Sequence, residues 1–172
     1  MIKKILGLLL CVLALPAAAH AGHAPAEGFA AGLAHPFLGL DHLLAMVGLG
    51  MWSRRQEQPL ALPLTFVAMM AVGALLQTGF TVAEGWIAAS VVATGLLLAA
   101  VRLPLWGAIT VVSLFALLHG QVHGHELPGL ASGAGFLLAS AVLLGVGLSL
   151  GRPRAMGWII ACSGLWMLAR VA

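Results

Sequence analysis

Long apolar runs separated by short polar, glycine- or proline-containing connections make up most of the chain after its first two dozen residues. A helix rises about 1.5 Å per residue, so crossing the bilayer core of about 30 Å takes about 20 residues. The pattern therefore predicts an all-α polytopic membrane protein, with six spans at residues 30–52, 60–80, 84–101, 104–123, 130–150 and 155–171. Because all the connections are short, we expect any activity to lie inside the helix bundle or at its rims.

The first 21 residues are typical of a secretory signal peptide. Two lysines precede an apolar run at residues 5–15 that is too short to span, and small residues follow it. We expect cleavage after Ala21, with Ala19 as the alternative site and an uncleaved anchor as the alternative interpretation. The mature chain, residues 22–172, then forms one six-helix transmembrane domain whose N-terminus lies outside the cytoplasm.

The arginines predict the same orientation. With the N-terminus outside, the loops after the first, third and fifth spans are cytoplasmic, and positive charge concentrates in cytoplasmic loops. The arginines in these three loops are Arg54, Arg55, Arg102, Arg152 and Arg154. Six spans place the C-terminus outside as well.

Composition excludes several other classes of protein. Hydrophobic residues make up 62% of the chain and charged residues 8%, whereas soluble domains carry about 25% charged residues. Disordered chains are rich in charge and poor in apolar residues, so disorder is excluded too. The few cations are scattered and form no basic stripe, which argues against a nucleic-acid partner. We expect the chain to be surrounded by membrane lipid. Its oligomeric state does not follow from the sequence.

Glycine recurs at a spacing of four residues inside the spans. Such pairs let two helices approach closely in lipid, where packing replaces the hydrophobic drive. We expect close packing at Gly120/Gly124, Gly129/Gly133 and Gly147/Gly151.

The first predicted span contains His35, Asp41 and His42. Polar side chains at this depth are costly and usually face a partner or a water-filled path. The two histidines are seven positions apart, so on a straight helix they share a face and lie about 10 Å apart along the axis. Met46 continues that face. Pro36 cannot donate a backbone hydrogen bond, so we expect a kink beside His35.

The fourth predicted span ends with a second polar group. His119 and His123 are four positions apart on one helical face, a spacing suited to binding one metal ion, and Glu126 extends that face. Counting helical rise places His119 level with His35 in the outer half of the membrane. His123, His125 and Glu126 then lie at the outer mouth, and the remaining polar residues of the first span lie nearer the midplane.

One histidine in a span is usually explained by a hydrogen bond to a neighbouring helix. Five histidines with an aspartate and a glutamate on two of six helices instead indicate a ladder of metal ligands. Imidazole and carboxylate ligands without thiolate favour Ni²⁺, Co²⁺ or Zn²⁺ and do not select among them. The secondary candidates are His125, Met46 and His23, the last as an exposed capture site or, alternatively, part of a frayed polar tail.

The run from His35 to Met46 resembles the signature of the HupE/UreJ family of hydrogenase and urease accessory proteins, and residues 119–126 resemble its second histidine segment. The resemblance implies a permease of the bacterial inner membrane for Ni²⁺, with Co²⁺ as a further substrate, supplying hydrogenase or urease without a permanently bound cofactor. It also implies a set of functional residues: His35, Asp41 and His42 as the principal ones, with His119, His123 and Glu126 as their partners.

Facilitated passage of a divalent cation through several modest sites in series is therefore the leading hypothesis, because a permease must also release its ion. A membrane-embedded metal-dependent hydrolase is the alternative. No nucleophile or general base is evident beyond the ligands themselves, which weighs against that alternative and against an enzyme in general. A metal sensor or chaperone anchored beside an enzyme is a third possibility, and the short loops disfavour it.

Overall fold

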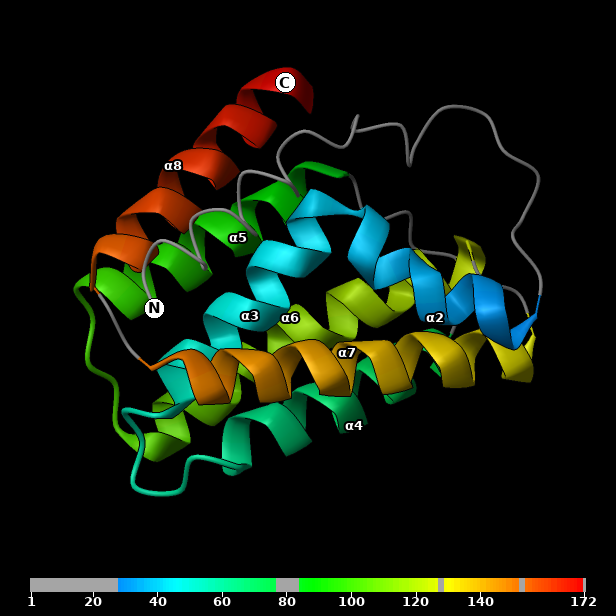
Figure 1. Ribbon diagram of the computed structural model, residues 1–172, viewed down its shortest axis with the longest axis horizontal. Coiled ribbons are helices and arrows are strands. Elements are labelled where there is room, and N and C mark those ends of the chain that lie inside the picture. Colours follow the sequence, from blue (N-terminus) through cyan, green and yellow to red (C-terminus); the bar gives the residue numbers. More distant parts are fainter. Residues whose placement is uncertain (1–27, 77–83, 127–128, 152–153, 172) are drawn as a thin grey trace.

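The computed structural model describes residues 28–76, 84–126, 129–151 and 154–171. Within these ranges the chain is all-α, as predicted, and forms seven helices (Figure 1). They are α2 (Phe29–Leu38), α3 (Leu40–Ser53), α4 (Ala61–Leu76), α5 (Glu84–Ala99), α6 (Leu105–Glu126), α7 (Leu130–Leu150) and α8 (Arg154–Val171). The predicted signal peptide and His23 lie outside the described residues.

The described helices differ in their capacity to cross a membrane. Two of them, α6 and α7, are each long and apolar enough to do so, and the bent pair α2 and α3 together makes a third candidate span. Ala61–Leu76 and Gly85–Ala99 are apolar but shorter. Each predicted span coincides with a helix or, at residues 30–52, with two helices. The count of six membrane crossings remains a prediction.

The first predicted span is bent, as expected from the sequence, but the bend lies at a different residue. The axes of α2 and α3 meet at 80°. The break lies at Gly39, whose backbone is extended at φ −88° and ψ 119°, rather than beside Pro36, which is buried within α2. Glycine carries a high entropic cost in a helix interior, so the chain leaves helical geometry there at little expense.

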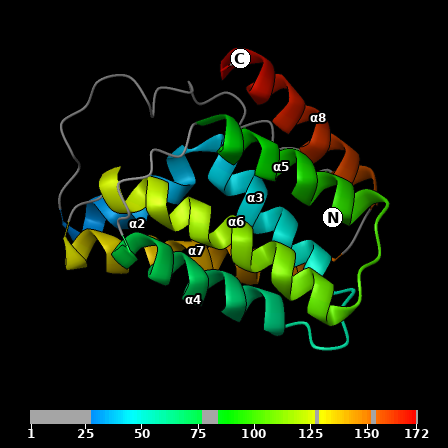
Figure 2. The ribbon, with the colours of Figure 1, turned by 180° about the vertical axis from the view of Figure 1, so that it is seen from behind.

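The helices pack mainly in pairs. Figures 1 and 2 show α4 lying along α6 and α5 lying along α8, while α2 and α3 both pack on α7. The bend sends α3 through the middle of the bundle, where it contacts α4, α5, α7 and α8. Most of α3 is therefore buried, including Met46 and Trp52. The helix that follows the bend is the centre of the core.

Two glycines let α2 lie directly on α7. A Cβ atom at Gly32 would overlap the backbone of Ser132, and one at Gly135 would overlap the carbonyl oxygen of Phe29. The two backbones thus touch without intervening side chains, a close approach typical of small residues in membrane helices. This contact fixes the position on α7 of the helix that carries His35.

The predicted glycine pairs are partly confirmed. Gly120 and Gly124 pack against the backbone of α4, and Gly147 packs against the backbone of α3. The prediction is wrong for Gly129/Gly133 and for Gly151, because no atom lies within 4 Å of a Cβ built at any of them among the described residues. The crossing with α2 uses Gly135 instead.

Candidate metal site

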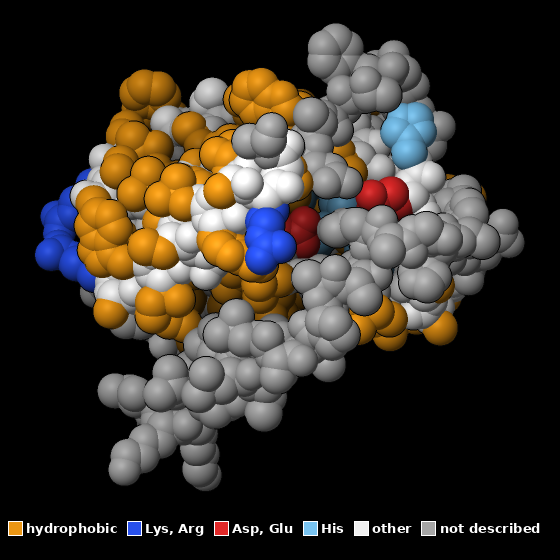
Figure 3. Space-filling model, turned by 90° about the horizontal axis from the view of Figure 1, so that it is seen from above, with side chains coloured by type: hydrophobic (Ala, Val, Ile, Leu, Met, Phe, Trp, Pro, Cys, Tyr) orange, Lys and Arg blue, Asp and Glu red, His pale blue; other side chains and the backbone are white. Residues whose placement is uncertain are grey.

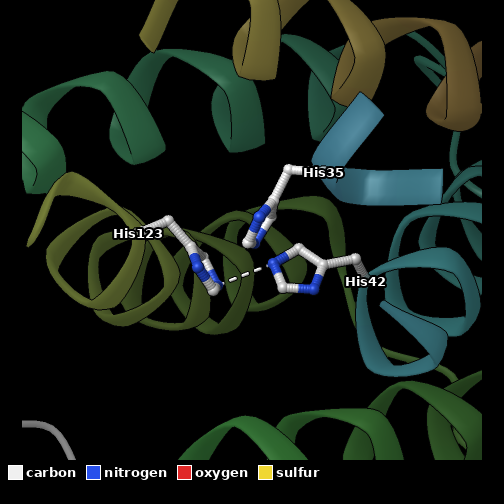
Figure 4. A group of neighbouring side chains, drawn as sticks. All are labelled: His35, His42 and His123. Carbon is white, nitrogen blue, oxygen red and sulfur yellow. Dashed lines mark hydrogen bonds between the residues drawn. The ribbon is translucent and has the colours of Figure 1, made fainter. Parts of the chain in front are cut away.

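Three histidines from three different helices converge inside the bundle. The ligand atoms of His35 (α2), His42 (α3) and His123 (α6) all lie within 4.8 Å of one another (Figure 4). The ring centroids of His42 and His123 are 4.1 Å apart, and His35 is 5.3 Å from each. His42 and His123 are buried, with 0% and 3% of their surfaces exposed. Three imidazoles at this separation can ligate one ion.

The bend at Gly39 creates this arrangement. His35 lies in the last turn of α2 and His42 in the first turn of α3, so the turn of the chain brings together two rings that a straight helix would separate. The predicted separation of about 10 Å along one helix axis is therefore wrong. The depth of His35 relative to α6 also differs from the prediction. His35 lies beside His123, one helical turn further along α6 than His119, with which it was expected to be level.

The buried rings of His42 and His123 are each held by a neighbouring carboxylate. Nδ1 of His42 lies 2.9 Å from Oδ1 of Asp41, and Nδ1 of His123 lies 2.6 Å from Oε2 of Glu126. A carboxylate accepts hydrogen bonds, so each Nδ1 is the donor and each Nε2 keeps its lone pair. Carboxylate-bound imidazoles of this kind are the usual arrangement behind metal-ligating histidines.

The two Nε2 atoms then face each other at 2.6 Å. Two lone pairs at that distance repel unless a cation lies between them. A shared proton fits the observed separation. A metal ion with bonds of about 2.0–2.1 Å in tetrahedral geometry needs its nitrogen ligands about 3.3 Å apart, so a small rotation of either ring opens the pair to a metal ion.

His119 adds a fourth imidazole beyond this pair. Its ring centroid is 5.9 Å from that of His42, and its Nδ1 lies 2.9 Å from the carbonyl oxygen of Phe115. With Nδ1 donating to that carbonyl, Nε2 carries a lone pair, and in the described part of the chain this buried atom has no hydrogen-bond partner. A buried acceptor of this kind suits a second, deeper ligand position.

Of the other predicted site residues, two carboxylates contact the histidine group, and His125 and Met46 lie outside it. Asp41 and Glu126 have partly exposed side chains, at 17% and 38%, and contact the histidines that they flank. Glu126 also lies 3.5 Å from Nε2 of His35. His125 is exposed at the end of α6 and takes no part in the three-histidine group. Met46 is fully buried in the apolar core.

Comparison with known proteins confirms the family that the sequence resembles. Residues 8–169 match the family model described as HupE / UreJ protein. The chain belongs to the HupE/UreJ family. Protein HupE of Rhizobium leguminosarum bv. viciae is 42% identical over 166 residues, which cover 88% of this chain and 86% of that relative. No solved structure matches the chain.

Phe136 is a site residue of this HupE/UreJ chain that sequence reasoning missed. Its ring centroid lies 5.7 Å from those of His35 and His42 and 5.2 Å from that of His123. Helix α7 carries no ionisable residue, and no site residue is predicted on it from the sequence. No pattern in the sequence marks Phe136, because its role depends on how α2 packs on α7.

A cavity of about 330 Å³ reaches the histidine group from one side. Asp41, His123, Glu126 and Arg170 contribute to its lining, and the Arg170 guanidinium lies 4.8 Å from the ring centre of Trp166. Acidic and histidine side chains appear together on this face in Figure 3, with a basic side chain nearby. We call this cavity the vestibule.

On its opposite side, the histidine group meets tightly packed side chains in the described part of the chain. His119 borders a void of only about 10 Å³, which Ser90, Thr94 and Trp52 also line. That is about the space for one water molecule. Beyond it lies the apolar core around Trp52. Within the described residues, therefore, the histidine group borders cavities on its outer side and packed side chains on its inner side.

Proposed function

We propose that this chain carries a divalent metal ion, Ni²⁺ with Co²⁺ as a second substrate, across the bacterial inner membrane to supply hydrogenase or urease maturation. The observation that carries the proposal is the convergence of His35, His42 and His123 inside a bundle of apolar helices. Membership of the HupE/UreJ family supports the same function.

Charge balance favours a divalent cation. The carboxylates of Asp41 and Glu126 contact the histidine pair directly, and two carboxylates with neutral imidazoles carry a formal charge of two minus. A divalent ion cancels that charge, and a neutral site costs far less inside a membrane than an unpaired charge. The donors are nitrogen and oxygen, which suit Ni²⁺, Co²⁺ and Zn²⁺.

The proposed path begins at the vestibule. The ion first meets Asp41 and Glu126, sheds part of its water among His35, His42 and His123, and moves on to the free Nε2 of His119. These ligands form overlapping modest sites, since a closed four-ligand cage would retain the ion. The closed packing around Trp52 means that release requires the inner half of the bundle to open.

The proposed orientation has six spans and both termini outside. Arg55, Arg102 and Arg154, which are predicted to be cytoplasmic, line one cavity together, whereas the vestibule is lined by residues at the opposite helix ends. The separation of basic loops from the vestibule is what the positive-inside rule expects for uptake from the outer side.

Uptake of radioactive nickel by proteoliposomes containing the purified protein tests the proposal. Wild type is expected to accumulate nickel above the level of vesicles without protein, and His42→Ala and His119→Ala are expected to abolish that excess. His125→Ala is the matched control, because this histidine is exposed and outside the group. If wild type takes up no more than protein-free vesicles, or if both substitutions leave uptake unchanged, the transport proposal fails. Competition by Co²⁺, Zn²⁺ and Mg²⁺ gives the ion order.

A further inference from the structure

A second large cavity lies away from the histidine group, at the other end of the bundle. It has a volume of about 730 Å³. Three arginines line it: Arg55 from the loop after α3, Arg102 from the loop after α5, and Arg154 at the start of α8. These arginines are far apart in sequence, and the fold gathers them around one space.

The lining has the chemistry of an anion site. The lining includes three arginines and a single acidic residue, Glu57, so positive charge is in excess. Guanidinium groups bind phosphate through paired hydrogen bonds. The first turn of α6, at Leu105 and Trp106, also borders the cavity, and the N–H groups of a first helical turn have no acceptor within the helix. A divalent cation would be repelled here, so this cavity is not a cation site.

Apolar side chains share the same cavity. Trp106 is 74% exposed and Val101 is 36% exposed, and both contribute to the lining beside the arginines. Inorganic phosphate has no apolar part that could contact such side chains. A lipid has a phosphate beside its acyl chains, and basic pockets between helices at the cytoplasmic side of a membrane bind anionic headgroups.

We propose that this three-arginine cavity binds the phosphate group of an anionic phospholipid. The arginines hold the phosphate, and Trp106 and Val101 contact the first part of the acyl chains. Because the ends of α3, α5, α6 and α8 meet at this cavity, a bound lipid ties together the helices that would separate when the inner half of the bundle opens. The site does not depend on metal binding, so its test is independent of nickel transport.

Native mass spectrometry of the purified protein in detergent tests the proposal, with dioleoyl phosphatidylglycerol as the probe and the zwitterionic dioleoyl phosphatidylethanolamine as the reference. We expect wild type to retain phosphatidylglycerol about tenfold more strongly. Arg102→Gln and Arg154→Gln singly are each expected to weaken this retention severalfold, and the double variant is expected to abolish the preference. Single variants keep the test decisive if the double variant does not fold.

Arg54→Gln is the matched control. It removes the same charge at the same end of the bundle, but Arg54 donates to the carbonyl oxygen of Leu148 at 2.6 Å and does not line the cavity. This variant should therefore retain the lipid preference. The proposal is overturned if wild type shows no preference, if both single variants bind phosphatidylglycerol like wild type, or if Arg54→Gln loses the preference equally. It is also overturned if millimolar inorganic phosphate displaces the lipid, because the ligand is then a soluble phosphate.

Discussion

The Nε2 atoms of His42 and His123 face each other at 2.6 Å, and each ring is held on its far side by a carboxylate, Asp41 for one and Glu126 for the other. This symmetric arrangement fixes both rings from behind and leaves their lone pairs on one shared space. His123 lines the vestibule, so the pair lies directly beside the space from which a cation would enter.

The Glu126 carboxylate, which contacts Nδ1 of His123, should raise the affinity for nickel by orienting that ring. Glu126→Gln keeps the size of the side chain but removes its charge, so it weakens the orientation of His123 and the attraction of a cation. We expect the nickel affinity, measured by equilibrium dialysis, to fall about tenfold to a hundredfold. Glu57→Gln, at the opposite end of the bundle, should leave it unchanged; equal losses in both variants would contradict the role of Glu126.

The break between α2 and α3 has no room for a side chain. A Cβ at Gly39 would lie 2.7 Å from Oδ1 of Asp41 and 2.8 Å from Nδ1 of His42. Gly39→Ala is therefore expected to push the carboxylate away from the imidazole and lower the nickel affinity about tenfold or more. The helical content, followed by circular dichroism, should stay the same.

Gly133→Ala provides the control for that substitution. It adds the same methyl group at a helical position where nothing lies within 4 Å among the described residues. Nickel binding should match wild type. Wild-type affinity in Gly39→Ala would show that the contact between Asp41 and His42 does not contribute to the site.

Much of the site could be predicted from the sequence, because ionisable residues are rare in apolar spans and their positions are visible. The residues that meet, His35, His42 and His123, are among those predicted. Their pairing could not be predicted, because it depends on an 80° bend at Gly39. A proline is the usual signal for such a break, and the chain breaks at a glycine further on.

In the fold, too, features set by neighbouring residues could be predicted, and features set by contacts between distant helices could not. Helix ranges follow from apolar runs, so each predicted span after the first coincides with one observed helix, and the first is divided into α2 and α3. Which glycines lie at crossings depends on how helices far apart in sequence meet. For this reason Gly135 was missed and Gly133 was wrongly chosen.

The crossing of α2 over α7 should tolerate no added volume. Gly135→Ala would place a methyl group against the carbonyl oxygen of Phe29, a backbone atom that cannot move aside as a side chain can. We expect the free energy of unfolding in detergent to fall by about 1–3 kcal/mol, the typical cost of overpacking. Gly145→Ala on the same helix meets no atom within 4 Å in the described part of the chain. A similar loss in this control would show that the effect comes from lost glycine rather than from the crossing.

Arg170 brings a positive charge to the vestibule that a cation must enter. Its guanidinium packs on Trp166, which holds it beside a lining that includes Asp41 and Glu126. Arg170→Gln should raise the initial rate of nickel uptake about twofold to tenfold at low ionic strength, and the difference should shrink as salt screens the charge. Arg170→Lys keeps the charge and should resemble wild type. A rate in Arg170→Gln that does not change with salt would rule out this electrostatic effect.

Nickel K-edge X-ray absorption of the nickel-loaded protein tests the central claim most directly, because it reports the atoms around the bound ion. We predict a first shell of nitrogen and oxygen only, with outer-shell scattering from three imidazoles, and a loss of imidazole scattering in His42→Ala with no loss in His125→Ala. Sulfur in the first shell, no imidazole scattering, or an unchanged spectrum in His42→Ala would contradict a metal site built from His35, His42 and His123.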